Sequence, residues 1–294
     1  MRVGAVDIGT NTVRLLVKDG AAELVHRVEV VGLGVGVDAS GVLSAEAMDR
    51  ATAMLAEYGA MLRSLGVERR RAVATSACRA ATNAADFLDR VEGVLGVRPE
   101  VISGDDEAAL SFRGATRAVG GEGPSLVIDI GGGSTEFVLG EGSIAYACSV
   151  EMGSVRLTDR LLPERPASSE GVALAVARVR DALAGVELPT TPRRVIGVAG
   201  TFTALAGIHL GLSIYDRSRV HSTILSLDDL EALVDRLTPL TIAETAALPS
   251  MDPRRAPVLL AGAVIAVESL RLSGPELIVS EHDLLDALVE DLGR

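Results

Sequence analysis

Apolar and polar positions divide the chain into two series of elements that follow the same order. Residues 3–17 read VGAVDIGTNTVRLLV and residues 125–139 read SLVIDIGGGSTEFVL. Each segment is a β-branched apolar run, a short turn rich in glycine and hydroxyls, and a second apolar run, which is typical of a β-hairpin. The two segments align at one offset that places Asp7 on Asp129. The pattern therefore predicts two copies of one unit.

A second correspondence follows each hairpin. Residues 70–83 (RRAVATSACRAATN) resemble residues 193–207 (RRVIGVAGTFTALAG), and each predicts a short buried strand that enters a small-residue turn and then a helix. Amphipathic helices are expected before each of them, over 44–65 and 168–183, with serine caps and early acidic residues.

Alternation of hairpins, strands and helices predicts an α/β fold made of two similar domains. The Gly-rich segment VGGEGPS at 119–125 predicts the boundary, giving domains 1–122 and 123–294. The apolar run at 256–267 predicts a buried helix. A last strand at 276–280 and a helix from about 283 could close the second sheet and reach back to the first domain.

Composition and charge exclude several classes of partner. The chain has 294 residues, 28 basic against 40 acidic side chains, a net charge of −12 and 2% aromatic residues, which argues against binding nucleic acid or an anionic membrane surface. The first residues lack the layout of a signal peptide, and the longest apolar run is well short of the ~20 residues that span a bilayer. Cys78 and Cys148 have no metal-ligand spacing. A soluble, cytoplasmic protein is expected.

The two hairpin turns have the composition of a phosphate site. Backbone N–H groups can approach an anion only where side chains are small or absent. The candidate residues are Gly9, Thr10, Asn11 and Thr12 in the first turn and Gly131, Gly132, Gly133, Ser134 and Thr135 in the second. Arg14 adds a guanidinium suited to phosphate oxygens.

Carboxylates beside both turns predict a metal ion. Asp7 and Asp129 end apolar strands, where an ionised carboxylate needs a partner cation, and Glu136 is the third candidate ligand. Carboxylate oxygens next to phosphate suit Mg²⁺, with Mn²⁺ as an alternative.

The acidic segment VISGDDEAALSF at 101–112 adds a candidate base. Its acids could simply complement the dipole of the helix that they begin. Alternatively, Glu107 at this strand-to-helix turn could deprotonate a water molecule.

Taken together, these motifs resemble the exopolyphosphatase and guanosine pentaphosphate phosphatase family, within the superfamily of actin, sugar kinases and heat-shock chaperone ATPases. The matching stretches run in the family's order: DIGTNTVRLLV (7–17), ATSACRAATN (74–83), ISGDDEA (102–108), DIGGGSTEF (129–137), MGSVRLTD (152–159) and LIVSE (277–281). The resemblance implies duplicated ribonuclease H-like domains around a cleft and hydrolysis of terminal phosphates from inorganic polyphosphate.

The resemblance also implies roles for particular residues. Glu107 is similar to the family's base, and Asp7, Asp129 and Glu136 to its metal ligands, with Glu136 also counted as catalytic. The implied phosphate contacts outside the two turns are Arg14, Ser76, Arg79, Asn83, Gly200 and Thr201. Ala199 and Phe202 depart from the family's usual Gly-Gly-Thr pattern, which puts the contact at 198–202 in question.

Alternatives remain open at this stage. The same base and metal would serve a guanosine pentaphosphate 5′-phosphohydrolase, and an actin-like phosphate or nucleotide sensor would need neither. Adenine nucleotides are further possible ligands, and relatives suggest a homodimer.

Overall fold

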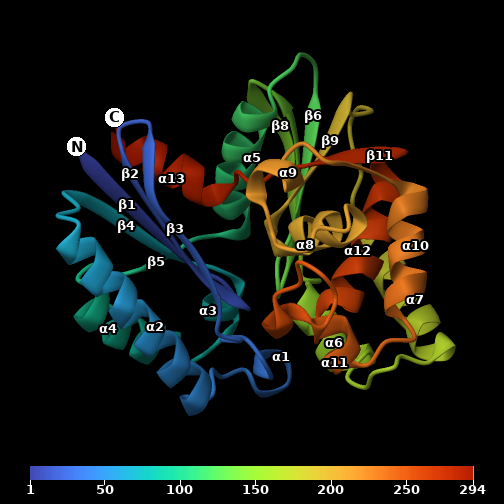
Figure 1. The fold of residues 1–294 in the computed structure, drawn as a ribbon, viewed down its shortest axis with the longest axis horizontal. Helices are drawn as coiled ribbons and strands as arrows, with labels where there is room; N and C mark the ends of the chain where they lie inside the picture. Colours follow the sequence, from blue (N-terminus) through green and yellow to red (C-terminus); the bar gives the residue numbers. More distant parts are fainter. Residues whose placement is uncertain (294) are drawn as a thin grey trace. The chain divides into compact units, whose positions relative to one another are not determined.

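The computed structural model describes residues 1–293, which contain two mixed β-sheets with helices packed against them (Figure 1). The chain forms two compact units. Unit 1 comprises Met1–Leu110 and Leu284–Arg294, and unit 2 comprises Ser111–Asp283. Nowhere in the described part of the chain is there a helix with the length and apolar character required to cross a membrane.

The sheet of unit 1 has the strand order β3-β2-β1-β4-β5. Its strands are β1 (Arg2–Ile8), β2 (Thr12–Asp19), β3 (Ala22–Val30), β4 (Arg69–Ala74) and β5 (Glu100–Val101). The first three strands are antiparallel neighbours, whereas β4 runs parallel to β1 and β5 parallel to β4. The turn between β1 and β2 is the first predicted hairpin.

Helices cover both faces of this sheet. The helices of the unit are α1 (Val37–Ser40), α2 (Ala45–Ser64), α3 (Ser76–Ala80), α4 (Ala84–Leu95), the first part of α5 (Gly104–Val119) and α13 (Leu284–Gly293). Side chains of α2 and α4 share a core with Val6 and Ile8 on one face, and those of α13 pack with Val3 and Ala5 on the other. Asp7 follows the alternation of Val3 and Ala5 and therefore belongs to the face that α13 covers.

Unit 2 repeats this arrangement with one added strand. Its strands are β6 (Ser125–Ile130), β7 (Thr135–Glu141), β8 (Ser143–Val150), β9 (Arg194–Val198), β10 (Ile224–Ser226) and β11 (Glu276–Val279), in the order β10-β11-β9-β6-β7-β8. Strands β6 to β8 are antiparallel and β9 and β11 run parallel to β6, as in unit 1. The duplicated ribonuclease H-like fold is therefore confirmed.

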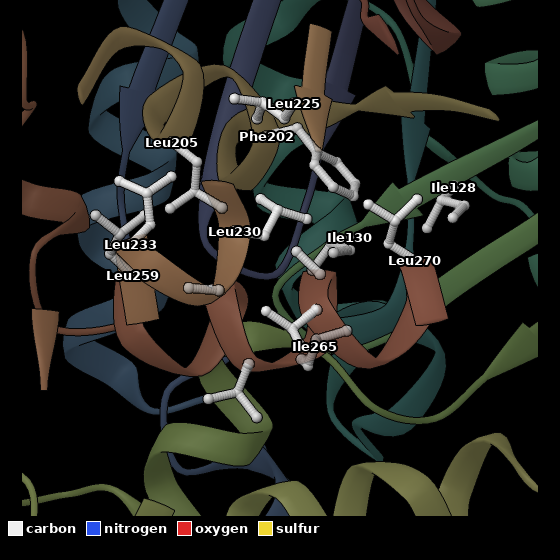
Figure 2. Packing of buried hydrophobic residues seen from close by; sticks show 14 of the residues in the cluster. Ile128, Ile130, Phe202, Leu205, Leu225, Leu230, Leu233, Leu259, Ile265 and Leu270 are labelled. Carbon is white, nitrogen blue, oxygen red and sulfur yellow. The ribbon is translucent and has the colours of Figure 1, made fainter. Parts of the chain in front are cut away.

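The core of unit 2 is built around a long apolar helix, as the run at 256–267 predicts. The helices are α6 (Ser154–Leu161), α7 (Ser169–Leu183), α8 (Ala199–His209), α9 (Arg217–Val220), α10 (Leu227–Leu237), α11 (Ile242–Ala246) and α12 (Leu259–Ser273), with a 3-10 turn at Pro253–Arg255. Figure 2 shows Leu259, Ile265 and Leu270 of α12 beside Ile128 and Ile130 of β6 and side chains of α8 and α10. The turn between β6 and β7 therefore follows a strand that is buried in this core.

The compact units divide the chain elsewhere than the predicted boundary between residues 122 and 123. The first division falls inside α5, because Ser111 donates a hydrogen bond to Asp129 (2.6 Å) and Gly114 packs on the backbone of Asp283. The second follows Asp283, because α13 returns to unit 1, where Lys18 and Asp286 form an ion pair at 2.9 Å. Glycine-rich composition marks a surface turn, whereas the division depends on packing.

Candidate functional site

The two hairpin turns close with the same hydrogen bond. The N–H of Gly9 donates to the carbonyl of Thr12 at 2.9 Å, and the N–H of Gly131 donates to the carbonyl of Ser134 at 3.0 Å. The sequence repeat thus corresponds to a repeat in backbone geometry. Each unit carries one of these turns.

In unit 2, the carbonyl groups of the turn are held by the start of α6. The carbonyls of Gly131 and Gly132 accept hydrogen bonds from the amides of Ser154, Val155 and Arg156, at 3.0, 2.9 and 3.1 Å. In a planar trans peptide the next N–H points opposite to the carbonyl. The N–H groups of Gly132 and Gly133 therefore point away from α6, in the orientation that an anion-binding turn requires. The first amides of α6 donate to carbonyl groups of the turn, so they are not available to bind an anion.

Close backbone packing explains a glycine next to this turn. Gly153, directly before α6, lies so close to the backbone of Gly132 and Gly133 that no Cβ would fit. Any larger residue would displace the turn or the helix that holds its carbonyl groups.

In unit 1, the segment after β3 plays the part of α6. The amides of Val31 and Gly32 both donate to the carbonyl of Asn11 at 2.9 Å, and the amide of Gly34 donates to the carbonyl of Thr10 at 2.7 Å. The N–H of Asn11 is turned away from this segment by the same peptide geometry. Both turns are thus oriented by a following segment of the chain.

Two carboxylates lie side by side in unit 2. Asp129 on β6 and Glu136 on β7 are directly opposite in the antiparallel register, so their side chains share one face of the sheet. They are 7% and 1% exposed. Ser111 donates to Asp129 Oδ2 at 2.6 Å and Ser149 donates to Glu136 Oε1 at 2.8 Å.

Unit 1 has a different pair at the same place. Asp7 on β1 is opposite Arg14 on β2, and the guanidinium of Arg14 binds Asp7 Oδ2 at 2.7 Å through Nη2 and 2.8 Å through Nε. The partner cation that Asp7 requires is therefore supplied by Arg14. A metal role for Asp7, and a phosphate contact for Arg14, would have to compete with this ion pair.

The pair of Asp129 and Glu136 fits a hard divalent cation. Mg²⁺ usually takes one or two carboxylates and completes its shell with waters and phosphate oxygens. Among residues 1–293 no group of three or more His, Cys, Asp or Glu side chains is arranged to hold a metal. The donor set present is thus one that would bind Mg²⁺ with a phosphate ligand, and not a preformed cage.

Glu107 lies in the first turn of α5 and forms an ion pair in unit 1. Nη1 of Arg79 contacts Glu107 Oε2 at 2.8 Å and also donates to the carbonyl of Ile102 at 3.0 Å. This contact fixes the orientation of the Glu107 carboxylate, and a candidate general base needs a defined position. The structure therefore brings two predicted site residues together, with Arg79 acting on Glu107.

The thiol next to Arg79 is excluded as a nucleophile. Cys78 is 4% exposed, and burial raises the pKa of its thiol to about 12. Only the thiolate is strongly nucleophilic, so this cysteine stays inert near neutral pH.

Two other predicted phosphate contacts are buried or engaged within unit 1. Oδ1 of Asn83 accepts a hydrogen bond from the N–H of Leu43 at 2.8 Å, and Nδ2 of Asn83 donates to the carbonyl of Leu43 at 2.9 Å. The oxygen and the nitrogen of this side chain are thus both bonded to the backbone of Leu43. Ser76 is 5% exposed at the start of α3. In this structure Asn83 acts as a backbone clamp.

The departure at 198–202 has a structural explanation. Phe202 is fully buried and its ring lies against Gly197 of β9, where a Cβ would not fit. Ala199 takes a positive φ of 67° at the start of α8, a conformation that favours glycine. Gly200 is covered by the guanidinium of Arg255, and Thr201 packs on Gly262 of α12. A cation thus lies at the start of α8.

The hydroxyl partners of the carboxylates were not predicted from the sequence. Ser111 lies four residues after Glu107 on α5, and Ser149 lies near the end of β8. Helical spacing and strand alternation give the face of each serine, but only the fold shows which carboxylate each one meets.

Comparison with known proteins places these features in a family. Residues 16–287 match the model of the Ppx/GppA phosphatase family. The chain is 40% identical over 314 residues to Exopolyphosphatase 2 of Mycobacterium tuberculosis, covering 99% of this chain and 98% of that protein. It is 33% identical to the guanosine-5′-triphosphate,3′-diphosphate pyrophosphatase of Vibrio atlanticus, over 81% of this chain and 49% of that protein. A solved exopolyphosphatase from Cytophaga hutchinsonii superposes with a TM-score of 0.92 at 32% identity, covering 99% of this chain and 97% of that one.

Proposed function

The chain belongs to the Ppx/GppA phosphatase family, and on that premise we propose that it is an exopolyphosphatase that releases orthophosphate from the ends of inorganic polyphosphate. The observation that carries the choice of substrate is the match to Exopolyphosphatase 2 of Mycobacterium tuberculosis along 98% of that protein. The guanosine-5′-triphosphate,3′-diphosphate pyrophosphatase of Vibrio atlanticus is matched over only 49% of its length.

The turns would bind the phosphate groups. The N–H groups of Gly132 and Gly133 in unit 2 and of Asn11 in unit 1 are oriented by hydrogen bonds to the neighbouring carbonyl groups. Asp129 and Glu136 would hold Mg²⁺, or Mn²⁺, which neutralises phosphate charge when it is bound. Such positioning and charge neutralisation account for most of the catalysis of phosphoryl transfer.

Glu107 would act on the attacking water. Its ionised carboxylate takes a proton from water, the water oxygen bonds to the terminal phosphorus, and the bridging P–O bond breaks with its electron pair on the shortened chain. The ion pair with Arg79 holds Glu107 in one orientation while the substrate is absent. The proposal includes a cytoplasmic location and a homodimer, and sedimentation velocity tests the latter.

The deciding experiment measures phosphate release from polyphosphate and from guanosine pentaphosphate with the same enzyme. We expect faster release from polyphosphate, dependent on Mg²⁺ or Mn²⁺ and abolished by chelation. A higher kcat/KM for guanosine pentaphosphate would favour the second candidate, which the Vibrio atlanticus relative supports. Binding of either substrate without release would indicate a sensor and would contradict the proposal.

A further inference from the structure

Three polar side chains form a row across the sheet of unit 2. Asp129 on β6 is opposite Glu136 on β7, and Glu136 is opposite Ser149 on β8. Directly opposed residues of antiparallel strands project from the same face of the sheet. The row therefore presents two carboxylates and a hydroxyl on one face.

Adjacent buried carboxylates are costly for a sheet. Like charges directly opposite each other destabilise a pair of strands, and burial of Asp129 and Glu136 increases this cost. Each of the two carboxylates accepts a hydrogen bond from one serine hydroxyl. Ser149 Oγ donates to Glu136 Oε1 at 2.8 Å, and Ser111 Oγ donates to Asp129 Oδ2 at 2.6 Å.

The matching row of unit 1 has different residues at its second and third positions. There Asp7 is opposite Arg14, and Arg14 is opposite Val28. Charge is neutralised within that row by the ion pair of Asp7 and Arg14, and the third position has no hydroxyl. In unit 2 the row has a carboxylate in place of the guanidinium and a serine in place of the valine.

We propose that Ser149 is a positioning residue that holds the carboxylate of Glu136 oriented for a divalent cation, with Ser111 doing the same for Asp129. This inference rests on the proposed function, in which the two carboxylates bind Mg²⁺. A hydroxyl that donates to one carboxylate oxygen fixes the plane of the carboxyl group. The direction in which the other oxygen faces is then set before the metal arrives.

Variants at residue 149 can remove the hydroxyl group or keep it without changing the strand. Ser149→Ala removes the donor and leaves the strand intact, whereas Ser149→Thr keeps the hydroxyl on a residue that strands favour. Ser143→Ala is a matched control, because Ser143 is an exposed serine at the other end of β8. Ser111→Ala tests the companion contact.

The experiment measures Mn²⁺ binding to the full-length protein by electron paramagnetic resonance, without substrate. We expect Ser149→Ala and Ser111→Ala to weaken binding about 10- to 100-fold, which is typical when an outer partner of a metal ligand is lost. Ser149→Thr should restore affinity, and Ser143→Ala should match the wild type. Equal affinity of Ser149→Ala and the wild type, or loss in Ser149→Thr equal to that in Ser149→Ala, would overturn the inference.

Folding and function are kept separate in this design. If Ser149→Ala fails to fold by circular dichroism, Ser149→Cys takes its place as a variant of similar shape with a weaker donor. Failure of the wild type to release phosphate from polyphosphate would contradict the proposed function and leave the affinity ratios to judge Ser149. Normal phosphate release with unchanged metal affinity in Ser149→Ala would contradict the inference alone.

Discussion

The carboxylate of Glu107 and the guanidinium of Arg79 are 2.8 Å apart, and each is largely shielded from water. The contact gives Arg79 a role that its resemblance to a phosphate ligand does not include. A substrate phosphate that attracts Arg79 would have to share it with Glu107, so substrate binding and orientation of the base are linked through one side chain.

Replacement of Glu107 by Gln should remove the base and keep the shape of the side chain. We expect kcat for polyphosphate to fall by about 10²- to 10⁴-fold, the range associated with general base catalysis, with polyphosphate binding retained. Asp105→Asn is the control, since Asp105 is exposed in the same helical turn and loses the same charge. Phosphate release and equilibrium binding measure the two quantities, and full activity of Glu107→Gln would show that another group activates the water.

A substitution at Ala199 is expected to stabilise the protein. Its φ of 67° is strained for alanine, so Ala199→Gly should raise the free energy of unfolding by up to about 1 kcal/mol. The same substitution at Ala204, inside α8, should lower that free energy by about 1 kcal/mol. Urea denaturation followed by circular dichroism compares the two variants. A loss of stability in both would mean that the backbone at Ala199 is not strained.

Individual elements were predicted well where their signals are local. The helices expected at 44–65 and 168–183 are α2 and α7, and Ser44 and Ser168 cap them by accepting from the amides of Ala47 and Gly171. Hairpin turns were found for the same reason. The clamp of Asn83 on Leu43 was not predicted, because it joins residues 40 positions apart that only the folded loop brings together.

Helix α10 gives a pH-dependent prediction. Asp229 closes a capping box, in which its carboxylate accepts from the hydroxyl (2.6 Å) and the amide (2.9 Å) of Ser226, and these bonds lower the pKa of Asp229. A lowered pKa means that the stabilisation is present above the unfolded value of about 3.9 and is lost as the pH falls through the folded value.

We therefore expect Asp229→Ala to lower the free energy of unfolding by about 1 kcal/mol at pH 7, with a smaller difference at pH 3. Asp228→Ala is the control, because Asp228 is exposed in the same turn and is not part of the capping box. Denaturant titrations at both pH values measure the difference. A difference that persisted unchanged at pH 3 would show that ionisation of Asp229 contributes nothing.

At the scale of the whole chain, the C-terminal helix α13 belongs to unit 1, together with the N-terminal residues. Helix α13 buries Leu285 and Leu288 with Val3 and Ala5 of β1, although unit 2 separates them in sequence. The sequence pattern predicted the helix and allowed for its return. It could not give the division inside α5, because that depends on which sheet the side chains of α5 contact.

Because α13 packs in unit 1, a substitution in this helix should destabilise unit 1 more than unit 2. Leu288→Ala, at a fully buried position, should cost about 2–5 kcal/mol and increase hydrogen exchange in β1, β2 and β4 more than in β11 or α12. Leu277→Ala on β11 is the matched control and should have the reverse pattern. Mass spectrometry of peptides reports both. Equal protection changes in the two units would indicate that they unfold together.

The different partners of Asp7 and Asp129 also make the two units differ in charge. The position opposite this aspartate is arginine in unit 1 and glutamate in unit 2. In unit 1 the arginine forms an ion pair with Asp7, whereas in unit 2 the same two strand positions place two carboxylates side by side. Glu136→Arg would therefore place an arginine opposite Asp129, which is the pair of residues that unit 1 has at this position.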